Sequence, residues 1–201
     1  MNIIVTEESE HGDIPIDIYS KLAKDRILFL HDEINDELVT DVIATLMIKD
    51  VESPDDKITI FINSETADLR SVFMLYDTIK ILQSPIETIC VGVAGNEAVL
   101  LLAAGTPGMR YATANSVINA SQHIAGGQGI FDLADAYLHM DRIKRNNKQF
   151  MTAFAKCVKK PYKTVMKDFE KPQFFSARQA IKYGIIDGII TKSEVHHEEQ
   201  E

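Results

Sequence analysis

The sequence has only two cysteines in 201 residues, Cys90 and Cys157. This scarcity excludes the class of small secreted domains that depend on several disulfide bridges for their stability. Cys90 falls inside an apolar run rich in β-branched residues, which predicts a buried strand. We therefore expect Cys90 to be a core thiol in a reducing compartment.

Positive charge is also scarce, since 21 Lys and Arg residues face 30 Asp and Glu residues and the net charge is -9. Binding to a phosphate backbone requires basic patches, so the balance argues against nucleic acid as the main partner. No apolar run approaches the length of a membrane span, and the start, MNIIVTEESEHGD, is too acidic for a signal peptide. These absences predict a cytoplasmic protein, or one of a plastid-type organelle, with no membrane partner.

What the sequence does contain is a regular alternation of strand and helix patterns. Its length and its 45% apolar content suit one domain with a sizeable core. Strand patterns cover 26–30, 57–63, 87–93, 109–112 and 117–120, and helix patterns cover 35–49, 69–82 and 130–158. A short helix and a last strand follow within 176–190. Such alternation predicts an α/β fold with a largely parallel sheet.

The two ends of the chain differ from the domain between them. Residues 1–20 are acidic and irregular in pattern, and residues 193–201 end in HHEEQE, which predicts a disordered tail. Residues 21–192 hold the regular pattern and show no internal repeat or second boundary.

The helix pattern over 130–158 is unusually long. Leu133, Tyr137, Ile143, Phe150 and Phe154 form one apolar stripe between charged faces. A helix of roughly 40 Å is too long to lie wholly on a domain of this size. We expect it to project and to pack against another chain.

The stretch from Glu87 to Gly105, ETICVGVAGNEAVLLLAAG, carries the strongest functional signal. Its β-branched run stops at two glycines and an apolar helical run starts at once, which predicts a sharp turn at Gly95-Asn96-Glu97. Many hydrolases place a nucleophilic serine on such a turn, where backbone amides at the helix N-terminus stabilise negative charge. Here the turn carries an asparagine.

Several blocks together resemble the proteolytic subunit of the Clp protease, ClpP, from about residue 17 to residue 191. The resemblance rests on DIYSKLAKDRILFL, ITIFINS, LYDTIKILQSPIETICVG, LLLAAGTPGMRYATANS, the GGQG run and FFSARQAIKYGIIDGII. It implies a ClpP/crotonase-like spiral of strand-helix units, with an axial loop and first strand in 1–20. A projecting handle of strand plus long helix would cover about 121–159. The resemblance also implies heptameric rings that stack through the handles into a tetradecamer, and an AAA+ unfoldase partner.

Members of this family that cleave peptides use a serine, a histidine and an aspartate. The resemblance aligns these three positions with Asn96, Ser121 and Pro172 of this chain. The two oxyanion donors would be the backbone amides at Glu97 and at Ala67, in a Glu65-Thr66-Ala67 segment that replaces a Pro-Gly-Gly loop. All of these positions depart from the family pattern.

The remaining residues offer little replacement chemistry. Ser121 and His123 could form a non-standard dyad, but residues two apart on a strand have diverging side chains and neither follows a sharp turn. His31 and His139 are interpreted as surface or interface residues, and His196 and His197 as part of a solvated tail. No spacing is typical of zinc ligands or of a phosphate loop, so we expect no metal and no cofactor.

These observations predict a ClpP-like subunit without peptidase activity, similar to the non-catalytic subunits called ClpR. It would serve ring assembly or regulation, alone or with an active ClpP paralogue. One alternative is an active serine-type endopeptidase of the Clp system that uses Ser121 and His123. Another, by analogy of fold alone, is an acyl-CoA-binding enzyme of the crotonase type.

Overall fold

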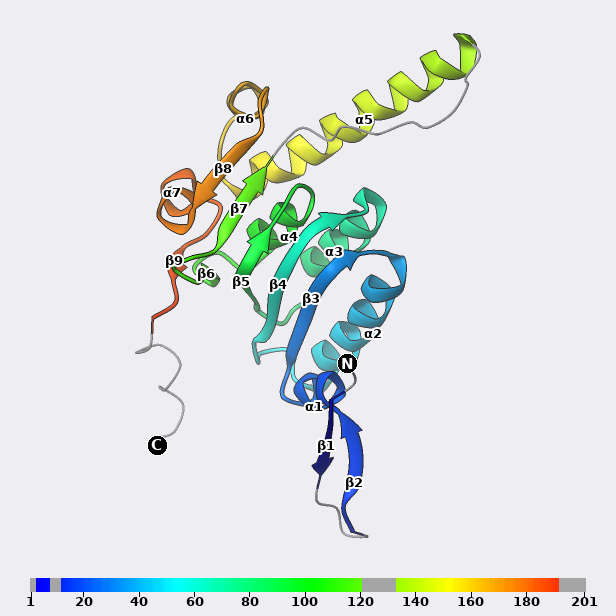
Figure 1. Cartoon of the computed structure of the whole chain (residues 1–201), viewed down its shortest axis with the longest axis vertical. Coiled ribbons are helices and arrows are strands. Elements are labelled where there is room, and N and C mark those ends of the chain that lie inside the picture. The colour runs from blue at the N-terminus through cyan, green and yellow to red at the C-terminus, as the bar shows by residue number, and fades with distance from the viewer. Residues whose placement is uncertain (1–2, 8–11, 121–132, 192–201) are drawn as a thin grey trace.

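The computed structural model describes residues 3–7, 12–120 and 133–191, and a mainly parallel sheet lies at its centre (Figure 1). The strands of this sheet are β3 (Ile27–Ile34), β4 (Ile58–Ala67), β5 (Ile86–Ala94), β6 (Arg110–Ala112), β7 (Val117–Ala120), β8 (Gln173–Ser176) and β9 (Gly188–Ile189). Their order is β3-β4-β5-β6-β9, with β7 paired to both β5 and β8. Only the β7–β8 pair is antiparallel within this sheet. The expected α/β fold of strand-helix units around a parallel sheet is confirmed.

Three helices follow β3, β4 and β5 and lie together behind the sheet in Figure 1. They are α2 (Asp36–Glu52), α3 (Leu69–Ile81) and α4 (Ala98–Ala104). The side chain of Asn35 accepts a hydrogen bond from Leu38 N at 3.0 Å and so caps α2 at the residue where the helix pattern of the sequence begins. All seven residues of α4 are buried, which makes this short helix the centre of the core.

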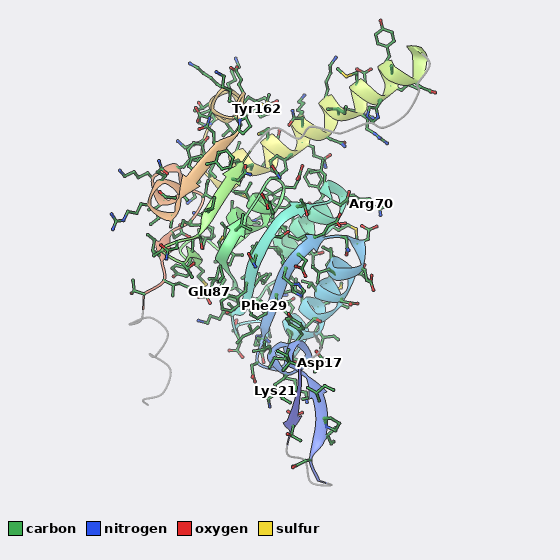
Figure 2. All side chains as sticks on the ribbon, in the orientation of Figure 1. Asp17, Lys21, Phe29, Arg70, Glu87 and Tyr162 are labelled. Atoms are coloured by element: carbon green, nitrogen blue, oxygen red, sulfur yellow. The ribbon has the colours of Figure 1, made fainter. Side chains whose placement is uncertain are left out.

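The two faces of the sheet are covered differently. Leu28, Leu30, Ile60 and Ile62 are buried on the face that packs against the helices. On the opposite face Phe29, labelled in Figure 2, is half-buried. Its ring stacks on that of Phe61, which is also half-buried, with 4.9 Å between centroids. The alternation of buried and half-buried residues follows from the two-residue period of a strand.

β3 and β4 extend beyond the predicted ends at residues 30 and 63. Each strand has a register irregularity at this point, between His31 and Glu33 in β3 and between Ile62 and Ser64 in β4. At the first of these Asp32 takes a positive φ of 56°. A bulge interrupts the alternation of side chains while pairing resumes beyond it, so the sequence pattern ends before the strand does.

Residues 1–20 are less irregular than the sequence predicts. β1 (Ile4–Glu7) and β2 (Ile14–Asp17) form an antiparallel pair that projects below the sheet in Figure 1. The carboxylate of Asp17 then accepts hydrogen bonds from Tyr19 N and Ser20 N, both at 3.0 Å, and starts α1 (Ile18–Lys24). A strand of four residues is too short for its alternation to stand out in the sequence. Such a strand forms because it pairs with a partner strand.

The long helix α5 (Leu133–Cys157) joins two environments. Phe150, Met151 and Phe154 near its C-terminal end are almost fully buried in the core. Tyr137 and Leu138 near its N-terminal end are 67% and 69% exposed, on the part that projects from the domain in Figure 1. The projecting helix is therefore as expected, whereas the strand portion of the handle, in 121–132, lies outside the described residues.

The chain after α5 returns to the sheet through two short helices. The sequence pattern missed α6 (Tyr162–Asp168), which starts directly after its N-cap residue Pro161. α7 (Ala177–Tyr183) begins with a capping box between Ser176 and Gln179 and ends at Gly184, whose φ is 95°. The predicted tail, 193–201, lies outside the described residues.

A partly buried ion pair joins the C-terminal part to the core. The Arg110 guanidinium donates to Asp187 through Nε at 2.8 Å and through Nη2 at 2.7 Å, and it also donates to Cys157 O at 3.1 Å. These contacts tie together β6, the end of α5 and the segment before β9. The hydrogen bond from Arg110 lowers the pKa of Asp187 below its usual value of 3.8, although burial acts in the opposite direction.

We expect Asp187→Ala to lower the free energy of unfolding by about 2–3 kcal/mol at pH 7, because it leaves the Arg110 side chain buried without its partner. Since the pKa of Asp187 is lower in the folded protein, the pair stabilises the fold above pH 3.8. That stabilisation is lost as the pH falls through the folded-state pKa. Urea unfolding at pH 7 and at pH 3 measures both effects.

Asp187→Asn is the matched control for charge. It keeps an oxygen acceptor for Arg110, so we expect a smaller loss at pH 7 and a smaller difference from the wild type at pH 3. Equal stability of wild type and Asp187→Ala at pH 7 would contradict the assigned role of the pair.

Candidate active-site elbow

The turn between β5 and α4 has the sharp geometry that the sequence predicts. β5 ends at Ala94 and α4 begins at Ala98, so Gly95, Asn96 and Glu97 make the whole turn. We call these three residues the elbow. Asn96 has a positive φ of 48°, a conformation that asparagine adopts more readily than most residues with a side chain. The elbow therefore has the strained form that presents a nucleophile in hydrolases, with an amide side chain in its place.

The elbow is held against β4 by a very close approach of two backbones. A Cβ atom at Gly95 would lie 2.6 Å from Glu65 O and 2.9 Å from Glu65 Cα, which leaves no room for a side chain. Gly95 N donates a hydrogen bond to Ser64 O at 2.9 Å. Glycine at position 95 is thus needed for space, since its φ is not in the positive range.

The side chain of Asn96 adds a second link to the same strand. Its Nδ2 donates to Glu65 O at 3.1 Å, so the amide bridges the elbow and β4. An amide nitrogen is neither basic nor easily deprotonated at neutral pH, and this one is already used as a donor. The arrangement positions Asn96 firmly and gives it no nucleophilic chemistry.

One acidic residue belongs to the elbow and a second lies against it. Glu97 precedes α4 and is 9% exposed, while Glu65 lies on β4 and is exposed. Oxyanion stabilisation needs donors or positive charge at the point where negative charge develops. A carboxylate beside that point opposes it.

The segment Glu65-Thr66-Ala67, which the resemblance aligns with a Pro-Gly-Gly loop, is here the last part of strand β4. Thr66 pairs with Glu33 and Ala67 pairs with Ile34, so β4 stays hydrogen-bonded to β3 through this segment. Between the pairs His31–Asn63 and Glu33–Thr66, β4 contains one more residue than β3, and pairing resumes beyond this bulge.

A buried hydroxyl that the sequence analysis missed supports this extended strand. Ser64 Oγ lies 2.7 Å from Thr66 O and also contacts Asp32 O, and it is 1% exposed. Asn63 Oδ1 accepts from Val93 N at 3.2 Å and connects β4 to β5. The signal for both was the polar Asn-Ser pair directly after the apolar run ITIFI.

The sheet register brings the region of the other two aligned positions to the same edge as the elbow. Ile118 of β7 pairs with Ala94, two residues before Asn96, and Ala120 pairs with Gln173 of β8. Pro172, which precedes Gln173, is exposed. It has no N–H and no charge, so it cannot orient a base. Ser121 follows Ala120 in the chain but, like His123, lies outside the described residues.

The other candidate residues have structural surroundings. Burial raises the pKa of the Cys90 thiol to about 11 and also raises that of Cys157, which fits a core role for both. His31 stacks on Tyr19 with 5.2 Å between ring centroids, and Arg142 Nη2 donates to His139 Nδ1 at 3.2 Å. His196 and His197 lie outside the described residues.

Neither a metal site nor a membrane span is evident in the part of the chain that the structure describes. Its His, Cys, Asp and Glu residues form no group of three or more that could hold a metal ion. Over the same ranges, every helix is too short or too polar to cross a bilayer.

Comparison with models of known protein families gives a match over most of the chain. The model of the family described as "Clp protease" matches residues 10–193, which is nearly the whole chain. The matched span includes the elbow, the Glu65-Thr66-Ala67 segment and the positions of Ser121 and Pro172.

We expect Gly95→Ala to lower the free energy of unfolding by about 1–3 kcal/mol, because its Cβ would force two backbones apart. Gly188→Ala is the control, since a Cβ there would meet only ring atoms of Tyr111 at 3.2 Å. Urea denaturation of both variants measures the difference. If Gly95→Ala proved no less stable than Gly188→Ala, the close approach at the elbow would not be a real constraint.

Proposed function

This chain belongs to the Clp protease family, and we propose that it is a member without peptidase activity that serves as a ring subunit. The observation that carries the proposal is the Asn96 amide, which takes the place of a nucleophile and is hydrogen-bonded to Glu65 O. Ser121 and Pro172 stand at the other two aligned positions, and neither residue type can perform the role of the histidine or the aspartate.

The state of the oxyanion positions supports the same proposal. Glu97 and Glu65 bring negative charge to the elbow, where catalysis of acyl transfer requires its opposite. Ala67 replaces a glycine position in a segment that is here part of β4. The chain thus keeps the fold of the family. It lacks the nucleophile, the base, the acid that orients the base and the loop of oxyanion donors that peptide hydrolysis uses.

The role that remains is assembly. Members of this family form rings that work with AAA+ partners, and we propose that this chain contributes to the ring wall, either with its own copies or with an active paralogue. Such a subunit could also adjust which unfoldase docks on the ring.

An exposed group of apolar residues is suited to contact with a neighbouring subunit. Met47, Ile48 and Val51 near the C-terminus of α2 are 53%, 58% and 84% exposed, and Ile81 at the end of α3 is 76% exposed. We call these four residues the α2–α3 apolar patch. Asp50 joins the two helix ends, because its carboxylate accepts from Ser84 N at 2.7 Å. Apolar groups gathered on a surface in this way mark protein–protein contact.

We expect the purified protein to leave a fluorogenic peptide uncut and to remain unlabelled by a fluorophosphonate probe that labels an active family member. Asn96→Ser should likewise show no peptide cleavage and no probe labelling, because position 121 supplies no base. Covalent labelling of the wild type that disappears in Ser121→Ala would refute the proposal and favour a serine-type peptidase built on Ser121 and His123.

We expect native mass spectrometry to show ring-sized complexes of the chain alone or mixed with an active paralogue. Val51→Glu should lower the ring fraction severalfold by placing a charge in the α2–α3 apolar patch, while circular dichroism stays unchanged. Asn115→Glu, in the exposed turn between β6 and β7, is the control and should assemble normally. Monomers alone under every condition would overturn the ring-subunit proposal, whereas normal assembly of Val51→Glu would overturn only the role of the patch.

A further inference from the structure

The distribution of charge along α5 and α6 is unlike that of the rest of the chain. Residues 142–167 contain nine of the 21 Lys and Arg residues and not one Asp or Glu, in a protein whose net charge is -9. A local surplus of one sign creates a field that attracts ligands of the other sign, whatever the net charge. This segment is therefore the place to look for an anionic partner.

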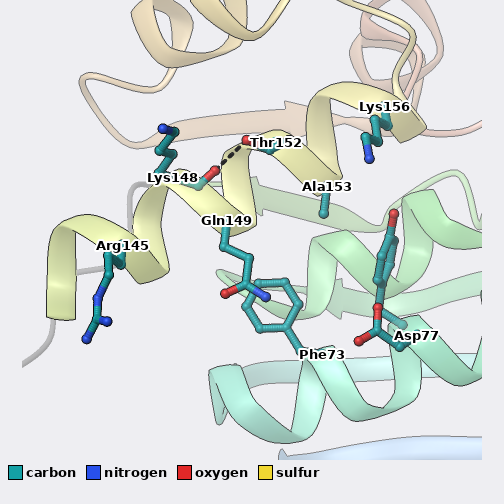
Figure 3. Close-up of a pocket in the computed structure, with 9 residues that line it drawn as sticks. Phe73, Asp77, Arg145, Lys148, Gln149, Thr152, Ala153 and Lys156 are labelled. Atoms are coloured by element: carbon teal, nitrogen blue, oxygen red, sulfur yellow. Dashed lines mark hydrogen bonds between the residues drawn. The ribbon is translucent and has the colours of Figure 1, made fainter.

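Part of this basic segment lines a groove. The groove lies between α3 and the C-terminal half of α5, has a volume of about 380 Å³, and is shown in Figure 3. We call it the α3–α5 groove. Its floor on the α3 side is made by the half-buried rings of Phe73 and Tyr76, one helical turn apart.

The α5 side of the groove is cationic. Arg145, Lys148 and Lys156 all line it, and the spacing of Arg145 and Lys156 places them on one helical face. In Figure 3 Gln149 reaches from α5 toward Phe73, Lys156 points toward the α3 side, and Lys148 points away from it. Among the described residues, Arg145 and Lys156 form no ion pair, whereas Lys144 outside the groove lies 4.0 Å from Asp141.

The dimensions of the groove define a ligand. Arg145 and Lys156 are eleven residues apart on α5, which is about 16 Å along the helix axis. An extended peptide rises about 3.3 Å per residue and its side chains alternate between two faces, so acidic side chains four positions apart share a face and span about 13 Å. The long, flexible side chains of Arg145 and Lys156 cover the remaining distance. An apolar side chain between them would meet Phe73 and Tyr76. Asp77 also lines the groove and repels such a ligand.

We infer that the α3–α5 groove binds acidic peptide segments that carry an apolar side chain between two carboxylates. Arg145 and Lys156 pair with the carboxylates, and the two rings of α3 receive the apolar side chain. The site is separate from the elbow, and it does not depend on whether Asn96 is inactive.

The test is fluorescence anisotropy of the full chain with the labelled peptide Glu-Ala-Phe-Ala-Glu, whose two carboxylates and aromatic ring share one face when the peptide is extended. We expect Arg145→Gln and Lys156→Gln each to weaken binding by about two- to fivefold, and Asp77→Asn to strengthen it by a similar factor. Lys144→Gln removes the same charge from α5 outside the groove, and it should bind as the wild type does. Unchanged circular dichroism for each variant separates these effects from misfolding.

Two further probes distinguish a built site from plain charge attraction. The peptide Lys-Ala-Phe-Ala-Lys should not bind, and a short DNA strand should neither bind as tightly nor discriminate between Arg145→Gln and Lys144→Gln. Absence of binding, equal binding of the DNA, or an equal loss in Lys144→Gln and Arg145→Gln would each overturn the inference. None of these outcomes bears on ring assembly or on peptidase activity.

Discussion

The structure depends on one contact at which no side chain fits. The backbone of Gly95 lies against that of Glu65, so β5 must end there and the chain must turn at once into α4. Because every residue of α4 is buried, this turn sets the position of the helix at the centre of the core. The same contact places Asn96 at the strand edge, with its amide on Glu65 O. Fold and candidate site thus share a single steric constraint.

That constraint is independent of the chemistry that the elbow carries in active members of the family. A positive φ on the turn needs a residue that tolerates it, and asparagine does so while adding a hydrogen bond to β4. A serine would satisfy the same backbone and could also be activated by a base. The backbone shape of the elbow is therefore compatible with either residue. In this chain the segment Glu65-Thr66-Ala67, which lies against the elbow, is part of strand β4.

The acidic net charge of the chain conceals a basic segment on α5 and α6. The net charge of -9 correctly describes the surface as acidic on balance, and from it alone an anionic partner looks excluded. The basic segment 142–167 reverses that conclusion locally, because Arg145 and Lys156 share a helical face beside two aromatic rings. Attraction between charges falls off over about 10 Å at ordinary ionic strength, so a ligand in the groove experiences the local surplus and little of the distant acids.

The sequence by itself determined the α/β class, the elbow, the cap at Asn35 and the length of α5, because periodicity, glycine positions and capping side chains act within a few residues of one another. It did not determine where β3 and β4 end, since bulges break the alternation while pairing with a neighbouring strand continues. Nor did it indicate that the first strands pair, or that Phe73 and Tyr76 line one groove with the cations of α5. Those features join residues far apart in the chain, and only the packing of α3 against α5 and of strand against strand decides them.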